Sequence, residues 1–253
     1  MQKTKLKTFL IWTAKVAAGL FTASVLIVIV YRFVPVPYTP LMLIRSLQAG
    51  SDRQLGANEK KWVSFDQMAP SIARSVVKAE DAKFYDHYGF DVEAIRKAYK
   101  YNQTHRQKKG ASTISQQTAK NVFLWPSRDW IRKGLETYFT VLIELVWPKQ
   151  RILEVYLNVI ELGPGVYGVE AASQRYFKHT AKKITNAEAA LIAAVLPNPR
   201  KFRIDRPSAY VLRRQSRILN RVAPPPQKIE EPAPLDDQDD SDLQFDDEDF
   251  SNF

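Results

Sequence analysis

An apolar run near the N-terminus constrains this chain more than any other feature. The 16 residues Val16–Tyr31 carry no charge, and Phe9–Ala14 extends the run with only Lys15 between the two segments. Sixteen residues make a helix of about 24 Å, shorter than the ~30 Å hydrocarbon core of a bilayer. Counted from Phe9, with the Lys15 amine reaching the interface, the segment is long enough to span a membrane.

A cleaved signal peptide and a buried core helix are the two alternatives for this run. The run is longer than the apolar region of a typical signal peptide, and no small-residue cleavage motif follows it. We therefore expect residues 1–34 to be a basic cytoplasmic N-terminus and a single transmembrane signal anchor. Four lysines precede the uncharged run and one arginine, Arg32, follows it, which places the N-terminus in the cytoplasm and the remainder outside the membrane.

The charge of the chain is divided unevenly. The formal net charge is +10, but residues 223–253 contribute −10 and residues 1–222 contribute +20. A body this basic favours an anionic partner, such as nucleic acid, anionic lipid or a phosphorylated substrate. The acidic segment 223–253 has few aliphatic residues, so we expect it to be a disordered tail. Cysteine is absent, which excludes disulfides and thiolate metal sites.

The periodicity of apolar residues from Asp66 onward is helical, and no long alternating run indicates a sheet. Prolines from Pro35 onward predict a stiff, extended exit from the membrane. We expect an extended membrane-proximal linker at 35–60 and one mainly α domain at 61–222. Capping residues, or proline in the first turn, predict the helix starts. These starts are at Pro70, Asp91, Thr113 with Gln116, Asp129, Pro148, and Thr185 with Glu188.

The stretch Lys78–Asp91 concentrates carboxylates and one histidine among aromatic residues. Glu80 and Asp81 lie near the C-terminal end of the predicted helix, where the helix dipole disfavours a carboxylate. Adjacent carboxylates in a half-apolar setting retain protons more strongly, which suits a general base. A solvated acidic turn is the alternative, since ion-pair networks also perturb carboxylates.

Two further constellations suit the binding of an anion. Gly110–Asn121 combines a glycine, hydroxyls at a helix start, amides and a lysine, and a helix N-terminus favours phosphate. Arg132 and Glu136 share a helix face with Lys133 beside them, which predicts a cationic clamp with a second carboxylate. The alternatives are a capped polar helix and a surface ion pair worth a few tenths of a kcal/mol.

Together these stretches resemble the signatures of the peptidoglycan glycosyltransferases, which are lysozyme-like enzymes. The first signature reads Glu-Asp-x-x-Phe-x-x-His-x-Gly-x-Asp, and the second is Gly-x-Ser-Thr-x-x-Gln-Gln-x-x-Lys-Asn. The five matching stretches, in the order of the family, are Glu80–Asp91, Gly110–Asn121, Arg132–Glu136, Lys149–Asn158 and Ala187–Pro199.

The resemblance covers about Trp62 to Arg221 and implies a mainly α, lysozyme-like helical domain with a single N-terminal transmembrane helix. Val34-Pro-Val-Pro and Thr39-Pro-Leu-Met also look like the monofunctional biosynthetic members of Gram-negative bacteria. We expect no penicillin-binding transpeptidase domain, because the chain ends too early to contain one.

The resemblance also implies the reaction. A growing glycan on undecaprenyl pyrophosphate is the donor, lipid II is the acceptor, and a β-1,4 bond forms as the pyrophosphate leaves. The implied partners are lipid II, the glycan strand, the membrane and cell-wall synthesis or division proteins, without nucleic acid. The implied location is the bacterial inner membrane, with the catalytic domain in the periplasm.

Each candidate site residue has a role under this resemblance. Glu80 would remove the proton from the attacking hydroxyl, and the cations would hold the leaving pyrophosphate. Glu136 would hold those cations or ligate a divalent metal on the pyrophosphate, for which Mg²⁺ or Mn²⁺ is suited; no tightly bound cofactor is expected. The predicted catalytic residues are Glu80 and Glu136, and the predicted substrate-binding residues are Asp81, Ser112, Gln117, Lys120, Asn121, Arg128, Arg132 and Lys133.

Two other classes of function remain open from the sequence. A glycan-cleaving enzyme, such as a lytic transglycosylase or lysozyme, would share the fold and a catalytic glutamate but has less need for a phosphate clamp. A membrane-tethered binder of nucleic acid or anionic lipid would use the basic body without chemistry. We expect His87 to be a structural histidine beside the active stretch rather than the base.

Overall fold

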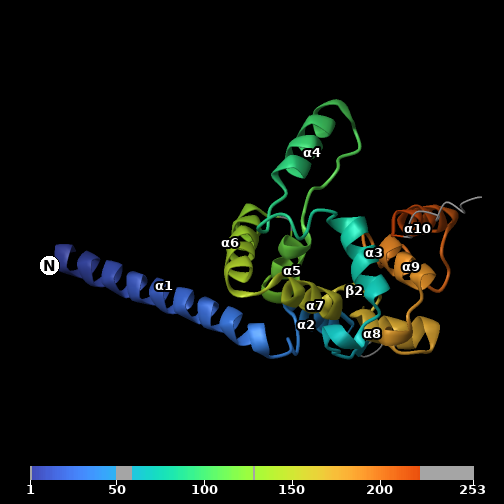
Figure 1. The fold of residues 1–253 in the computed structure, drawn as a ribbon. Coiled ribbons are helices and arrows are strands. Elements are labelled where there is room, and N and C mark those ends of the chain that lie inside the picture. The colour runs from blue at the N-terminus through green and yellow to red at the C-terminus, as the bar shows by residue number, and fades with distance from the viewer. Residues whose placement is uncertain (1, 50–58, 128, 223–253) are drawn as a thin grey trace, which may run out of the picture. The chain divides into compact units, whose positions relative to one another are not determined.

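The computed structural model describes residues 2–49, 59–127 and 129–222. The chain divides into two compact units, residues 1–222 and residues 223–253. The predicted acidic tail makes up the second unit and lies outside the described residues. The first unit is built almost entirely of helices (Figure 1), so the expected mainly α class is confirmed.

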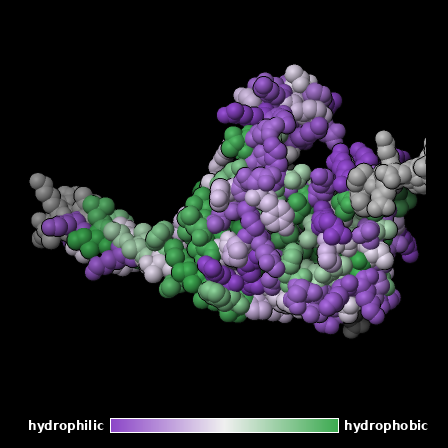
Figure 2. Space-filling view, viewed as in Figure 1, coloured by the Kyte–Doolittle hydropathy of each residue, from purple (hydrophilic) through white to green (hydrophobic). Residues whose placement is uncertain are grey.

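The N-terminal apolar run forms one long helix, α1 (Gln2–Phe33). Its segment Lys7–Phe33 is long and apolar enough to cross a membrane, and much of its surface is hydrophobic in Figure 2. The chain then runs without regular structure to α2 (Pro40–Ala49). The expected extended linker 35–60 is therefore corrected in part, because Pro40 begins a helix instead of continuing the extended segment.

Each predicted start signal is followed by a helix. Asp91 accepts a hydrogen bond from the Ala94 amide at 2.8 Å, and Thr113 forms a capping box with Gln116. The remaining helices are α3 (Pro70–Glu80), α4 (Val92–Thr104), α5 (Ile114–Phe123), α6 (Trp130–Val146), α7 (Lys149–Val159), α8 (Val169–Ala172), α9 (Asn186–Val195) and α10 (Ala209–Val222). The predicted signals give α3 to α7 and α9, whereas α8 and α10 had no predicted signal. Short turns of other helical types are η2 (Phe65–Gln67), η3 (Ser173–Phe177) and η4 (Ala181–Lys183).

A small sheet completes the unit and was not predicted. Its order is β1 (Glu59–Lys60), β3 (Val166–Tyr167) and β2 (Glu161–Gly163), with β1 parallel and β2 antiparallel to β3. Strands of two or three residues are too short to show an alternating pattern, so periodicity could not reveal them.

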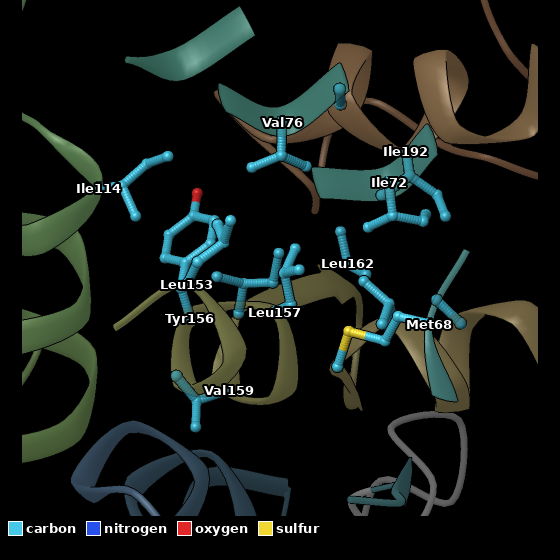
Figure 3. Packing of buried hydrophobic residues seen from close by; sticks show 14 of the residues in the cluster. Met68, Ile72, Val76, Ile114, Leu153, Tyr156, Leu157, Val159, Leu162 and Ile192 are labelled. Atoms are coloured by element: carbon cyan, nitrogen blue, oxygen red, sulfur yellow. The ribbon is translucent and has the colours of Figure 1, made fainter. Parts of the chain in front are cut away.

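The hydrophobic core is built around α7. Leu153 and Leu157 face Val76 and Ile72 of α3 in Figure 3, and all four are fully buried. Around this centre α3 packs on α9, α9 packs on α10, and α5 packs on both α6 and α7. Burying each such side chain contributes about 1.5–3 kcal/mol. The core therefore positions α3, α5 and α6, which carry most of the candidate site residues.

We predict that Gly168→Ala destabilises the fold. Gly168 has φ 81° and ψ 158°, a region open essentially to glycine alone. An added Cβ would also lie 2.7 Å from the Asn158 carbonyl oxygen. The free energy of unfolding should fall by about 2–3 kcal/mol, measured by thermal or denaturant unfolding.

The matched control is Gly134→Ala in α6, where no described atom lies within 4 Å of an added Cβ. This change should stabilise the fold by about 0.5–1 kcal/mol. Equal stabilities for Gly168→Ala and the wild type would show that the turn before α8 can adopt another conformation.

Candidate active site

The carboxylate of Glu80, the last residue of α3, is held by two other helices. Its Oε2 accepts a hydrogen bond from Gln117 Nε2 of α5 at 3.1 Å. Its Oε1 accepts one from Arg214 Nη2 of α10 at 3.3 Å. Both oxygens therefore have fixed donors while the side chain stays partly accessible, as a base that must meet a substrate requires.

A tyrosine of the core orients this arrangement. Tyr156 of α7 donates from its hydroxyl to Gln117 Oε1 at 3.0 Å. Burial, reinforced by the charges of Glu80 and Asp81, raises the pKa of Tyr156 well above its ordinary value. The hydroxyl therefore stays a donor, and it fixes the Gln117 amide so that its N–H group points at the Glu80 carboxylate.

Asp81 is buried, and its carboxylate binds other residues of the protein. Its carboxylate lies 3.0 and 3.2 Å from His87 Nε2, and its Oδ2 accepts the backbone N–H of Ile114 at 3.0 Å. It thereby ties the end of α3 to the start of α5. These contacts favour a supporting role for Asp81 over direct substrate binding, and they agree with the expectation that His87 is structural.

A second carboxylate lies on α6 among cations. Glu136 is 3% exposed; its Oε2 accepts from Arg132 Nη1 at 2.7 Å and its Oε1 accepts from Lys133. The Nε of Arg132 is buried and has no hydrogen-bond partner among the described residues. Glu136 therefore holds the two cations in place, and Arg132 keeps hydrogen-bonding capacity that the described residues do not use.

The amine of Lys120 interacts electrostatically with both carboxylates, that of Glu80 and that of Glu136. Burial lowers the pKa of Lys120, the charges of Arg132 and Lys133 lower it further, and Glu136 and Glu80 oppose the shift. The amine thus lies within electrostatic range of both carboxylates. Within the described part of the chain it makes no hydrogen bond or ion pair, so it is available to an anionic ligand.

The other predicted residues are less clearly placed. Ser112 is exposed and Asn121 is partly buried, and neither side chain has a recorded hydrogen bond to the described residues. Arg128 lies outside the described residues. The structure therefore brings Glu80, Gln117, Lys120, Arg132, Lys133 and Glu136 into one region, with Asp81 supporting it.

Two functional residues were missed by the sequence reasoning. The sequence singled out neither Arg214 of α10 nor Tyr156 of α7. A tyrosine in a buried stripe needs a partner for its hydroxyl, and this could have drawn attention to Tyr156. Arg214 lies 134 positions from Glu80 in the chain, and no local pattern joins the two.

The residues do not fit a metal held by the protein. The described residues contain no group of three His, Asp or Glu side chains that could hold an ion. Both oxygens of Glu136 already accept hydrogen bonds from cations. What the site offers is a positioned carboxylate at one end and a group of cations, Lys120, Arg132 and Lys133, at the other.

The chain matches a protein-family model and several known proteins. A family model described as "Transglycosylase" matches residues 49–223. Proteins named "Biosynthetic peptidoglycan transglycosylase" are similar over most of the chain. One from Bdellovibrio bacteriovorus is 59% identical, over 97% of this chain and 97% of its own. One from Bacteroides thetaiotaomicron is 53% identical (79% and 80%), and one from Escherichia coli is 52% identical (76% and 80%).

The internal contacts of Asp81 generate a stability prediction. Asp81→Asn should lower the free energy of unfolding by about 1.5–3 kcal/mol, because hydrogen bonds to a buried charged group are weakened. Thermal unfolding of the full chain measures the change. Asp86→Asn, at an exposed position of the same stretch, should leave stability unchanged. If Asp81→Asn left the free energy of unfolding unchanged, Asp81 would again be a candidate substrate-binding residue.

Proposed function

The chain belongs to the transglycosylase family, and on this basis we propose how its site polymerises lipid II into the glycan strands of peptidoglycan. It is a peptidoglycan glycosyltransferase with a lysozyme-like helical domain. The observation that carries the assignment of roles is the placement of the Glu80 carboxylate within electrostatic range of Lys120, which Arg132, Lys133 and Glu136 surround.

Glu80 acts as the general base. Its carboxylate accepts the proton of the acceptor's 4-hydroxyl while that oxygen attacks the anomeric carbon of the donor. The bond between this carbon and the pyrophosphate oxygen breaks, and a β-1,4 bond forms with inversion. The N–H groups of Gln117 and Arg214 keep the carboxylate aimed, so that little reorganisation is needed at the moment of proton transfer.

The cations stabilise the leaving group. Negative charge grows on the pyrophosphate as the bond breaks, and fixed donors aimed at it lower the barrier. Lys120 provides a point charge, and Arg132 is suited to phosphate because its planar guanidinium can make two parallel hydrogen bonds. Glu136 is a positioning residue here, because its two oxygens orient Arg132 and Lys133 instead of facing a substrate.

The cationic group also argues against a glycan-cleaving reaction. Cleavage of a strand expels a sugar hydroxyl, which carries no charge comparable to that of pyrophosphate. Three cations around one buried carboxylate would then have no transition-state charge to stabilise. Polymerisation uses every charged group of the site.

The membrane location of the chain follows from α1. We propose that α1 spans the bacterial inner membrane once, with the lysine-rich end in the cytoplasm and the catalytic domain in the periplasm. Exposed apolar residues of α6, including Trp130 at 91%, Ile131 and Leu145, suit contact with the lipid surface beside α1. Cell-wall synthesis or division proteins stay predicted partners.

A divalent cation on the pyrophosphate also stays a prediction. Phosphate oxygens and water would hold Mg²⁺ or Mn²⁺, since the described residues offer no cage of their own. The steps described for Glu80 and the cations do not depend on this ion.

The role of Glu80 predicts that Glu80→Gln abolishes polymerisation while lipid II binding is retained. Loss of the base should lower the rate by about 10²–10⁴-fold. Product length from labelled lipid II is measured on a gel, with binding measured separately. Glu93→Gln, an exposed carboxylate paired with Lys83 and Lys97, is the control and should behave as wild type. Release of fragments from preformed peptidoglycan, without polymer, would identify a cleaving enzyme instead.

The lowered pKa of Lys120 predicts a pH dependence. Its protonated amine holds the pyrophosphate, so kcat/KM should fall as the pH rises through a pKa below that of an ordinary lysine. Lys120→Arg keeps the charge to higher pH and should move this fall upward, at a reduced maximum. Lys201→Arg, at an exposed position, should leave the profile in place. An unmoved alkaline limb in Lys120→Arg would exclude Lys120 as its cause.

A further inference from the structure

The C-terminal end of α1 is bound by side chains of the catalytic domain. Trp147, between α6 and α7, donates from Nε1 to the Val28 carbonyl at 2.7 Å. Arg151, in the first turn of α7, donates to the Tyr31 carbonyl at 2.9 and 3.1 Å and to the Val34 carbonyl at 2.7 Å. We call Trp147 and Arg151, with these three carbonyls, the anchor clasp.

Other polar contacts surround the anchor clasp. Ser24 Oγ of α1 lies 2.7 Å from the hydroxyl oxygen of Tyr138 in α6. Arg32 donates from Nη1 to the Val146 carbonyl at 2.7 Å. The membrane helix is therefore joined to α6 and α7 by side chains on both sides of the contact, and not only by the chain that follows it.

The anchor clasp has a clear physical basis. Tyr31 is one of the last four residues of α1, whose carbonyls have no partner within that helix, whereas Val28 lies one turn earlier and Val34 follows the helix. The helix dipole gives this end a partial negative charge. A guanidinium supplies both donors and positive charge. The side chain of Arg151 is only 11% exposed, and in such a setting a charge-assisted hydrogen bond is stronger than in water.

The length of α1 is compatible with an anchor clasp at the membrane surface. The apolar segment Lys7–Phe33 has 27 residues, which make a helix of about 40 Å, against a hydrocarbon core of ~30 Å. The surplus is about seven residues. The clasped carbonyls lie within Val28–Val34, so with the surplus at this end the domain holds the part of the helix that exceeds the membrane core.

The same two helices hold the active site. Tyr138, which contacts α1, lies two positions after Glu136 in α6. Arg151 lies five positions before Tyr156 in α7, and Tyr156 orients Gln117 toward Glu80. A change in the angle between α1 and these helices would therefore move both the base and the cationic group relative to the membrane.

We propose that Trp147 and Arg151 are positioning residues that couple the membrane helix to the active site. They set the height and tilt at which Glu80 and the cations meet the pyrophosphates of two lipid-linked substrates. This inference rests on the proposed polymerisation of lipid II. Because both substrates are confined to the membrane surface, an active site at the wrong height would meet them poorly even with its internal geometry intact.

The test compares the full chain in lipid bilayers and in detergent micelles. The variants are Arg151→Ala, Trp147→Phe and their combination, with lipid II as substrate in both media. Micelles impose no fixed height, so only the bilayer rate should depend on the anchor clasp. Glu154→Gln is the matched control, because it removes the 2.9 Å ion pair of Arg151 and leaves its carbonyl contacts. Arg203→Ala controls for the loss of an exposed charge.

We expect the combined variant to lose about tenfold in bilayer rate, as a displacement of about 1 Å can cost more than this. Its micelle rate should stay near that of the wild type, and Arg151→Lys should recover part of the bilayer rate. An equal loss in both media would mean that the residues serve the internal fold, and an unchanged bilayer rate would mean that they position nothing. Either result overturns the inference.

A second readout is independent of activity. Since the chain has no cysteine, Leu20→Cys on α1 and Lys201→Cys on the domain give two unique positions for spin labels. The distance distribution between the labels should be narrow in the wild type and broad in the combined variant. Equal distributions would overturn the coupling. Failure of the wild type to polymerise lipid II in micelles would instead refute the proposed function, whatever the labels report.

Discussion

The structure depends on one shared hydrogen-bond network at the end of α3. Four helices meet at the Glu80 carboxylate: α3 carries it, α5 supplies Gln117, α10 supplies Arg214, and α7 supplies Tyr156 behind the glutamine. A partly buried carboxylate is costly unless it has partners, so the helices must be packed correctly before this site can form. Core packing around α7 and the orientation of the Glu80 carboxylate are thus parts of one arrangement.

On the cationic side of the site, in contrast to Glu80, the charges are not fully paired. Lys120, Arg132 and Lys133 repel one another, and Glu136 alone among the carboxylates of α6 binds two of them directly. Burial of Lys120 disfavours its charge further. Positive charge is therefore concentrated beyond what the protein neutralises, and an anionic substrate relieves this excess on binding. Such preorganisation costs stability in the free protein and contributes to catalysis when charge develops on the leaving group.

Features encoded locally were predictable from the sequence. Helix starts at Asp91 and Thr113 depend on residues three positions away, and the clamp of Arg132 with Glu136 lies within one turn. The partners of Glu80 were harder: Gln117 was found as a motif residue, whereas Arg214 comes from a distant helix. The short strands and the contacts of α1 with α6 and α7 also depend on tertiary packing, which no local pattern encodes. Asp81 was predicted to bind substrate, but in the structure its carboxylate contacts other residues of the protein.

Tyr156 has a consequence for any attempt to make this enzyme more robust. Its ring fills the core, while its hydroxyl is the first donor in the sequence of hydrogen bonds that ends at Glu80. Replacing it with phenylalanine would keep the apolar packing and leave the Gln117 carbonyl without its donor. Because an acceptor left without its donor costs free energy, this change would lower the stability of the fold and also release the Gln117 side chain that contacts Glu80. Thermostability and the orientation of Glu80 are therefore not independently adjustable at this position.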